Sequence, residues 1–481
     1  MTEDILSKYE MTIGIECHVQ LATDTKLFSY ADNDARDKAP NSVVSAIDYG
    51  LPGMLPVLNR KAVDLAIKAG KALNAEVARV SRFDRKHYFY PDLPKGYQTT
   101  QMYQPIILAG YVDAPLEDGS VVRVRIHHAH MEEDAGKLTH FGDYSLVDLN
   151  RAGTPLIEIV SEPDIHSAAA AKAFAAELHR LMVYAGVTNG DLYHGNMRFD
   201  VNISVALKGS ETLGKRAEVK NLNSFRSVEK AAEYEFRRQV ELIESGQEVK
   251  QETRGWDDAK LRTSSQRSKE DAQDYRYMPD ADIPPIVLTD AEIAEIQSTI
   301  PLLPPVYREK WVPLALDRSV VDSLLSTQAY ARLVTDVQDK AGDGAAKRVA
   351  HWFASALGRA EDELPQVTAA LSPDWFIELS QMVEKNELSS TAAKEIFLEI
   401  LTRNVPPRTI AEAKNLLQVS DESAIAAVVD EVLADPASQK SIEDINAGKD
   451  KAIGYLVGQV MKKSQGKANP ALAQKLIRER L

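Results

Sequence analysis

Residues 11–21 read M-T-I-G-I-E-C-H-V-Q-L, and polar and apolar side chains alternate along this stretch. Its polar side carries Glu16 and His18. Its apolar side carries Ile13, Ile15, Cys17, Val19 and Leu21. Successive side chains of a β-strand point to opposite faces of the sheet, so the alternation predicts a half-buried strand. Glu16 and His18 then share one face, where they can reach one metal ion or one phosphate between them.

The same alternation returns in two later segments whose polar sides also carry potential ligands. Residues 197–207 read M-R-F-D-V-N-I-S-V-A-L, and residues 216–221 read R-A-E-V-K-N. The polar sides hold Arg198, Asp200, Asn202 and Ser204 in the first segment and Arg216, Glu218 and Lys220 in the second. A face with this many charged groups is costly to bury unless a metal or a phosphate lies on it. The alternative is a solvated face of an antiparallel sheet, although Asp and Asn are poor strand formers.

A run of acidic residues follows three histidines in residues 127–138, H-H-A-H-M-E-E-D-A-G-K-L. Glu132 and Glu133 are consecutive, so their side chains face opposite ways in an extended chain. Both can bind metal only if the backbone turns or bulges there, and Gly136 makes such a turn plausible. The histidines at 127, 128 and 130 cannot all face one site. The alternative interpretation of the acidic run is a solvated loop.

The composition is that of an acidic globular protein. The chain has 481 residues, of which 44% are hydrophobic, and this length allows about two to four domains. No stretch approaches the roughly 20 apolar residues of a membrane helix, and the acidic start M-T-E-D-I-L does not resemble a signal peptide. The single cysteine, Cys17, is expected in the core; without a second one no internal disulfide forms, which fits the cytoplasm.

The last part of the chain is basic although the whole has a net charge of 57 minus 71, or -14. That balance argues against a broad nucleic-acid surface but allows a local one. Residues 449–481 contain Lys449, Lys451, Lys462, Lys463, Lys467, Lys475, Arg478 and Arg480 against Asp450 and Glu479. Such a density of basic residues can neutralise nucleic acid phosphates, and a solvated face is the alternative.

Proline-rich segments divide the chain. Alternating strands and helical segments are mixed up to Pro284-Pro285, whereas the periodicity beyond Pro301 is almost entirely helical. Val405-Pro406-Pro407 marks a second break. We therefore predict an α+β domain over residues 1–295, a helical domain over 296–410 and a helical tail over 411–481.

Common nucleotide-binding and hydrolase motifs are absent. The sequence contains no G-x-x-x-x-G-K-[ST], no G-x-G-x-x-G after a strand and no G-x-S-x-G. A carboxylate-rich sheet remains, on which two metal ions could bridge nucleotide phosphates during phosphoryl transfer. Two basic residues, Lys86 and Lys95, could add positive charge near this sheet.

Long blocks of the sequence closely resemble one family, the B subunits of the aspartyl/glutamyl-tRNA amidotransferases. They are I-G-I-E-C-H-V-Q-L (13–21), R-K-H-Y-F-Y-P-D-L-P-K-G-Y-Q (85–98), E-E-D-A-G-K-L (132–138), D-L-N-R-A-G-T-P-L-I-E-I-V-S-E-P-D (148–164), E-V-K-N-L-N-S-F (218–225), Q-E-T-R-G-W (251–256) and D-Y-R-Y-M-P-D-A-D-I-P-P (274–285). G-K-D-K-A-I-G-Y-L-V-G-Q-V-M-K (448–462) and G-K-A-N-P (466–470) resemble the family's C-terminal module. The blocks keep their order over nearly the whole chain.

The resemblance implies a fold and an activity. The fold is an α+β cradle domain like that of glutamine synthetase, with an antiparallel sheet, followed by all-α helical and YqeY-like tail domains that bind tRNA. The activity is ATP-dependent amidation of Glu-tRNA(Gln) or Asp-tRNA(Asn), through phosphorylation of the side-chain carboxylate. Ammonia would come from glutamine hydrolysed on an A-type amidase subunit, with a small C-type subunit completing a cytoplasmic heterotrimer.

The resemblance also implies roles for matching residues. The metal ligands are Glu16, His18, Glu132, Glu133 and Glu218, with Asp200 as a further contributor, and Glu16, Glu133, Asp200 and Arg198 are the catalytic set. We expect Arg151, Arg198, Lys220 and Asn223 to contact nucleotide or acyl phosphate, Lys86 and Lys95 to line the ammonia path, and Lys449, Lys451, Lys462, Lys463 and Lys467 to bind tRNA. Two Mg²⁺ ions are expected, with Mn²⁺ or Zn²⁺ an alternative at His18 because imidazole suits those ions.

Two departures and three alternatives accompany this resemblance. The family commonly has an M-E-E-G-S-like run where this chain reads L-Y-H-G-N (192–196), and it commonly has valine at Cys17. This chain therefore lacks an acidic residue that the family often has there. The alternatives are a stand-alone ligase for a free amino acid, a non-catalytic tRNA-binding scaffold, and an archaeal E-type subunit, which would carry an inserted domain that is not visible here.

Overall fold

The computed structural model describes residues 3–268, 274–357, 371–403, 405–418, 422–447, 449–464 and 467–481. It forms two compact units, Met1–Pro304 and Pro305–Leu481. No helix within these ranges is long and apolar enough to cross a membrane.

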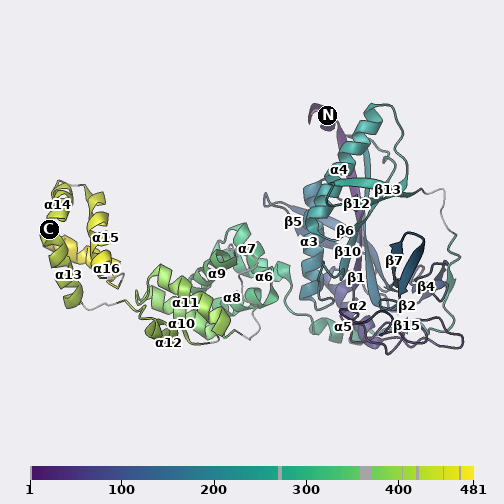
Figure 1. Cartoon of the computed structure of the whole chain (residues 1–481), viewed down its shortest axis with the longest axis horizontal. Helices are drawn as coiled ribbons and strands as arrows, with labels where there is room; N and C mark the ends of the chain where they lie inside the picture. Colours follow the sequence, from purple (N-terminus) through teal and green to yellow (C-terminus); the bar gives the residue numbers. More distant parts are fainter. Residues whose placement is uncertain are drawn as a thin grey trace. The chain divides into compact units, whose positions relative to one another are not determined.

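An eight-stranded sheet is the centre of the first unit (Figure 1). In spatial order its strands are β13 (Arg262–Ser268), β12 (Glu252–Asp257), β11 (Ala217–Leu222), β10 (Met197–Leu207), β1 (Tyr9–Gln20), β9 (Pro155–Ser161), β6 (Val121–Glu133) and β5 (Gly110–Pro115). Only β11 and β12 are parallel neighbours; the other pairs are antiparallel. The alternating stretch at residues 11–21 is thus part of a central strand, β1, as its pattern predicts.

Smaller sheets and helices complete this unit. The strands are β14 (Met278–Pro279), β3 (Asp84–His87) and β4 (Tyr97–Thr100) in one sheet, β15 (Ile286–Val287) with β2 (Val80–Ser81), and the hairpin β7 (Lys137–Phe141) with β8 (Tyr144–Asp148). The helices are α1 (Glu3–Leu6), α2 (Arg60–Ala72), α3 (Ala168–Tyr184), α4 (Phe225–Glu244) and α5 (Asp290–Ser298). The α+β class predicted from the sequence is confirmed.

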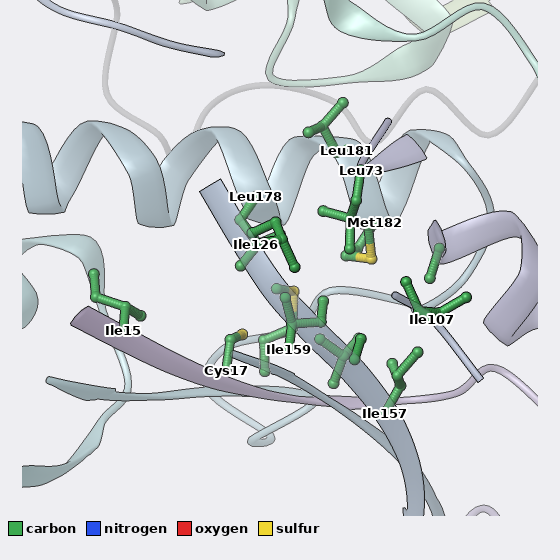
Figure 2. Close-up of a cluster of buried hydrophobic side chains, with 14 of the residues drawn as sticks. Ile15, Cys17, Leu73, Ile107, Ile126, Ile157, Ile159, Leu178, Leu181 and Met182 are labelled. Atoms are coloured by element: carbon green, nitrogen blue, oxygen red, sulfur yellow. The ribbon is translucent and has the colours of Figure 1, made fainter. Parts of the chain in front are cut away.

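The apolar face of the large sheet forms the core with α2, α3 and α4. Ser167 and Ser224 begin the two long helices, where their side chains accept hydrogen bonds from Ala170 N and Ser227 N; such a cap stabilises a helix by about 1 kcal/mol. Cys17 lies among core side chains from β9 and α3 (Figure 2) and is fully buried. Burial raises the pKa of its thiol well above the ordinary value, so Cys17 is a core residue, as expected from its side of the strand.

A β-bulge in β6 decides which residues of that strand face the core. Ile126 pairs with Ser161 and His128 with the preceding residue, Val160, so His127 is the additional residue. Before the bulge, even-numbered residues such as Ile126 face the core. After it, odd-numbered residues such as Ala129 do. Because one inserted residue reverses the alternation, His128, His130 and Glu132 all move to the polar face. A turn or bulge at Glu132–Glu133 is expected only if both residues bind metal; the irregularity of the strand lies at His127 instead.

The second unit is helical. Its helices are α6 (Pro304–Trp311), α7 (Arg318–Leu324), α8 (Gln328–Ala341), α9 (Asp343–Leu357), α10 (Pro373–Glu384), α11 (Ser390–Arg403), α12 (Pro407–Ala413), α13 (Glu422–Ala434), α14 (Gln439–Asn446), α15 (Ile453–Lys463) and α16 (Pro470–Arg480). The last four share a hydrophobic core of their own, which includes Val429, Leu456 and Ile477.

The expected domain boundaries at 295/296 and 410/411 both fall within helices. The first lies inside α5, which packs against α2, and the compact unit continues to Pro304. The second lies inside α12, which packs against α10 and α11. Gln418 N also donates to Glu387 O at 2.8 Å. We therefore place the start of the tail at α13, because the contacts of α12 are with the preceding helices.

Candidate metal and phosphoryl-transfer site

Strand register brings the polar side chains of β1, β10 and β9 together. Glu16 on β1 is paired with Asp200 on β10, and His18 lies between Arg198 on β10 and Glu158 on β9. This face is not a solvated one at its centre, because Glu132 and Asp200 are only 4% and 5% exposed. Buried carboxylates need cationic or hydrogen-bonding partners, and the partners found here define two groups.

The first group consists of His18, Glu132 and Glu158. His18 Nε2 lies 3.5 Å from a carboxylate oxygen of Glu132 and 3.8 Å from one of Glu158. One ligand atom from each residue lies within 4.8 Å of the other two. An imidazole nitrogen with two carboxylates is a donor set that suits Mn²⁺ or Zn²⁺ as well as Mg²⁺.

The second group consists of Glu16, Asp200 and Glu218, whose carboxylates also approach within 4.8 Å of one another. Lys220 Nζ lies 3.0 Å from Asp200 and 2.8 Å from Glu218, so an ammonium ion already balances part of this charge. Asn202 Nδ2 donates to Glu16 at 2.9 Å. The amide oxygen of the same side chain, Asn202 Oδ1, is buried, and it has no hydrogen-bond partner among the described residues. An all-oxygen set with an unused amide oxygen fits Mg²⁺.

The crowded charges shift the pKa values of both groups. Burial raises the pKa of Glu16, and the carboxylates of Glu158, Glu218 and Asp200 raise it further. Burial lowers the pKa of Lys220, but Asp200 and Glu218 outweigh it and raise that pKa above its ordinary value. Burial likewise opposes ionisation of Glu158, but the hydrogen bond from His130 and the charge of His18 lower its pKa. This face therefore favours bound cations.

Glu133 lies apart from both groups, although the family resemblance implies a place for it among the metal ligands. It follows Met131 on the core side of β6, where its carboxylate contacts Lys95 Nζ and accepts from Thr99 N at 3.0 Å. Lys86 lies on β3, where its Nζ is 4.8 Å from the centroid of the Tyr275 ring. The charge of Lys86 also lowers the pKa of Glu158. Lys86 and Lys95, which are expected to line the ammonia path, therefore both lie near carboxylates.

The residues that we expect to contact phosphate do not all lie together. Arg198 Nη2 donates to Asp134 at 2.9 Å, and Arg151 Nε lies 3.4 Å from the same carboxylate. Arg151 also donates to the carbonyls of residues 135 and 136 at 3.0 and 2.7 Å, which ties this turn to the sheet. Asn223 is exposed between β11 and α4. Asp134 thus joins the two arginines at one edge of the site.

Two residues of this face were missing from the sequence-based set. Glu158 is the only charged residue in the strand P-L-I-E-I-V-S (155–161), and that isolation within an apolar strand was a usable signal. His130 lies between the carboxylates, 3.1 Å from Glu158 and 3.8 Å from Glu132. Burial disfavours its protonation, but hydrogen bonds to Glu132 and Glu158 outweigh this and raise its pKa to about 10.

The turn that lacks the family's acidic residue has an acid of its own. His194 Nδ1 lies 2.6 Å from Asp191 Oδ2, and the backbone N–H of His194 donates to the other oxygen of the same carboxylate. Gln20 N donates to Asn196 O at 2.8 Å, so this turn adjoins the end of β1.

The five tail lysines proposed for tRNA binding are distributed over α15 and its flanks. Lys449 and Lys463 form ion pairs with Asp444 at 2.9 Å and Glu431 at 3.2 Å. Lys451 and Lys462 are exposed and Lys467 is half-buried.

Two acidic groups on one sheet, with basic side chains among them, are typical of the class of enzymes that transfer a phosphoryl group with divalent metal ions. Residues 11–294 match the family model described as "GatB/GatE catalytic domain", and residues 333–481 match the "GatB domain". The chain therefore belongs to the family of aspartyl/glutamyl-tRNA(Asn/Gln) amidotransferase B subunits, as its sequence blocks indicated.

Relatives named as such B subunits are similar over almost their whole length. The protein from Alkalilimnicola ehrlichii is 46% identical over 481 residues, covering 98% of this chain and 99% of the relative. The protein from Persephonella marina is 44% identical over 477 residues, covering 98% and 100%. The protein from a Synechococcus strain is 43% identical over 489 residues, covering 98% of each.

Proposed function

We propose that this chain is the amidating subunit of an aspartyl/glutamyl-tRNA(Asn/Gln) amidotransferase, which converts Glu-tRNA(Gln), Asp-tRNA(Asn) or both to the amidated forms. The names of its full-length relatives support the activity. The observation that carries the proposal is the pair of acidic groups built around β1, one with His18 and one with Glu16. A tRNA-binding scaffold has no need for two such groups.

The chemistry explains why ATP is required. A carboxylate is a poor acyl donor, so its oxygen first attacks the γ-phosphorus of ATP and ADP leaves. Ammonia then attacks the acyl phosphate carbon, the carbon–oxygen bond breaks, and inorganic phosphate leaves with the amide formed. Nitrogen loses one proton in this step, and the proton balances on the leaving phosphate. The protein has to hold the attacking carboxylate oxygen and the leaving oxygen of ADP in line at the γ-phosphorus, and to offset the negative charge that develops.

The two groups have the donors for divalent ions, which we propose to be Mg²⁺. Bound there, Mg²⁺ would offset phosphate charge during transfer. His18, Glu132 and Glu158 would hold one ion, and Glu16, Asp200 and Glu218 the other, supported by Asn202 Oδ1. Lys220 would then be released from part of its ion pairing and could contact a phosphate. Arg198, held by Asp134, would orient the acyl phosphate oxygens.

We further propose that ammonia arrives from the A-type amidase subunit along the core side of β6, where Lys95 contacts Glu133, with the small C-type subunit completing the assembly. The complex would act in the cytoplasm, where aminoacyl-tRNAs are used. The support is the buried contact between Lys95 and Glu133, on the opposite side of β6 from Glu132. A polar pair in this position can exchange hydrogen bonds with a passing ammonia molecule.

Replacing Lys95 and Glu133 should slow amidation with glutamine as the nitrogen source more than amidation with added ammonia. Lys95→Met combined with Glu133→Gln leaves no unpaired buried charge, and the introduced glutamine retains an acceptor for Thr99 N. We expect the rate with glutamine to fall about tenfold relative to the rate with added ammonia, or about 1.4 kcal/mol in barrier. Lys137→Met, an exposed change at the start of β7, is the control. An equal loss with both nitrogen sources would assign Lys95 and Glu133 to the chemical step instead.

The function itself is tested by reconstitution with the amidase subunit and the small C-type subunit. Glu-tRNA(Gln) and Asp-tRNA(Asn) are assayed side by side, each with glutamine or ammonium chloride as the nitrogen source. We expect ATP-dependent amide formation on at least one tRNA with both sources. Amide formed on free glutamate without tRNA would instead establish a stand-alone ligase, and tRNA binding without ATP hydrolysis would establish a scaffold.

A further inference from the structure

Three histidine rings on β6 form a continuous row that ends at the Glu158 carboxylate. His127 Nδ1 lies 2.7 Å from His128 Nδ1, and His128 Nε2 lies 3.2 Å from His130 Nδ1. His130 Nε2 lies 3.1 Å from Glu158 Oε2. His127 is exposed, whereas the other two rings are half-buried. The row therefore runs from the protein surface to the first acidic group.

The contacts in this row couple the proton positions of neighbouring rings. An ionised carboxylate only accepts hydrogen bonds, so His130 Nε2 donates to Glu158. Each nitrogen–nitrogen contact needs one donor and one acceptor, so the state of His130 Nδ1 decides whether His128 Nε2 donates or accepts. Because a neutral His128 ring has one donor and one acceptor nitrogen, its Nδ1 takes the opposite role toward His127 Nδ1. Each ring thereby fixes the tautomer and the orientation of the next one.

The orientation of His130 matters because two carboxylates compete for it. Its Nε2 lies 3.1 Å from Glu158 but also 3.8 Å from Glu132. A small rotation would transfer the hydrogen bond from one carboxylate to the other. The contact from His128 to the opposite nitrogen restricts that rotation, because Nδ1 and Nε2 belong to one rigid ring.

We propose that His128 is a positioning residue which, through His130, holds the Glu158 carboxylate in the orientation that a divalent cation requires. The inference rests on the metal role proposed above for Glu158. Groups that hydrogen-bond to metal ligands orient them, and their loss typically weakens metal binding by about 10-fold to 100-fold. The bulge at His127 is what allows this arrangement, since it brings His128 and His130 onto the face of Glu132.

Ring packing is the competing explanation, and two substitutions separate it from hydrogen bonding. The rings of His128 and His130 are stacked, with centroids 5.3 Å apart and planes inclined by 17°. His128→Phe keeps an aromatic ring but removes both nitrogens. His128→Gln removes the ring but keeps an amide that can offer His130 Nδ1 either a donor or an acceptor. His140→Phe is the matched control, because His140 is an exposed histidine on β7 that contacts Ser145.

The test is the affinity of the assembled complex, carrying the full chain, for Mn²⁺. Bound and free Mn²⁺ are distinguished by electron paramagnetic resonance without ATP or tRNA, and the titration is fitted with two sites. We expect His128→Phe to weaken one site about 10-fold, His128→Gln to weaken it by less than about threefold, and His140→Phe to match the parent. Melting temperatures without metal establish that each variant is folded.

Two results would overturn the inference. Unchanged Mn²⁺ affinity in His128→Phe would show that the row contributes nothing to Glu158, and equal losses in His128→Phe and His128→Gln would show that the ring itself matters. The measurement does not depend on amidation. A complex that binds Mn²⁺ with the expected differences but forms no amide would therefore refute the proposed function and leave this inference in place.

Discussion

Glu16→Gln is expected to reduce ATP-dependent amidation by on the order of 100-fold or more, even when ammonia is supplied directly. The change removes a negative charge from the second acidic group while Asp200 and Glu218 remain paired with Lys220. A cation site with one fewer charged ligand binds Mg²⁺ more weakly. The measurement is amide formation at saturating ammonium chloride over a range of Mg²⁺ concentrations, together with tRNA affinity, which should not change.

Glu10→Gln is the matched control for Glu16→Gln. Both residues lie on β1 and point to the same face, because six positions separate them. That spacing also places them about 20 Å apart along the strand. The two substitutions make the same chemical change, so general effects on the sheet cancel in the comparison. Normal amidation by Glu16→Gln would exclude the second acidic group from catalysis.

We expect tRNA to bind more weakly to the triple variant Lys451→Ala, Lys462→Ala, Lys467→Ala. The affinity should also depend less steeply on salt concentration. Each lysine that contacts a phosphate contributes about one unit to the slope of log affinity against log salt concentration. If all three contact phosphates, the slope therefore falls by about three. Filter-binding titrations between roughly 50 and 200 mM salt measure this slope directly.

A charge-matched control uses Lys8→Ala, Lys208→Ala and Lys250→Ala, which are exposed lysines of the first unit. It removes the same charge but leaves the tail unchanged, so its salt slope should equal that of the parent. The amidation rate at saturating tRNA should also be unchanged in the tail variant, because the acidic groups lie in the other compact unit. A tail variant with the parent's slope would place the tRNA contacts elsewhere.

Much of the candidate site could be predicted from local sequence patterns. The alternation in residues 11–21 identified Glu16 and His18 on one face and Cys17 in the core, and both placements are found in the structure. The same reasoning for residues 197–207 and 216–221 selected Asp200 and Glu218. These inferences succeed because the two-residue period of a strand is a local property, which requires no knowledge of neighbouring strands.

Family resemblance extended the set but did not resolve the details of β6. Glu132 and Glu133 both appeared as metal ligands, yet the strand continues through them without a turn, so they occupy opposite sides. Glu158 lay within a quoted block without a role. Its place in the first group depends on β9 pairing with both β1 and β6, and this pairing cannot be obtained from the pattern of β9 alone.

The sequence by itself determined the family, the α+β class with a helical second half, and the face on which each polar residue of β1, β10 and β11 lies. Only the tertiary structure decided that those residues form two acidic groups, that Lys220 lies within one of them, and that a bulge at His127 aligns a histidine row with Glu158. The physical reason is that side-chain alternation is set within a strand, whereas strand order and register follow from packing the whole sheet against its helices.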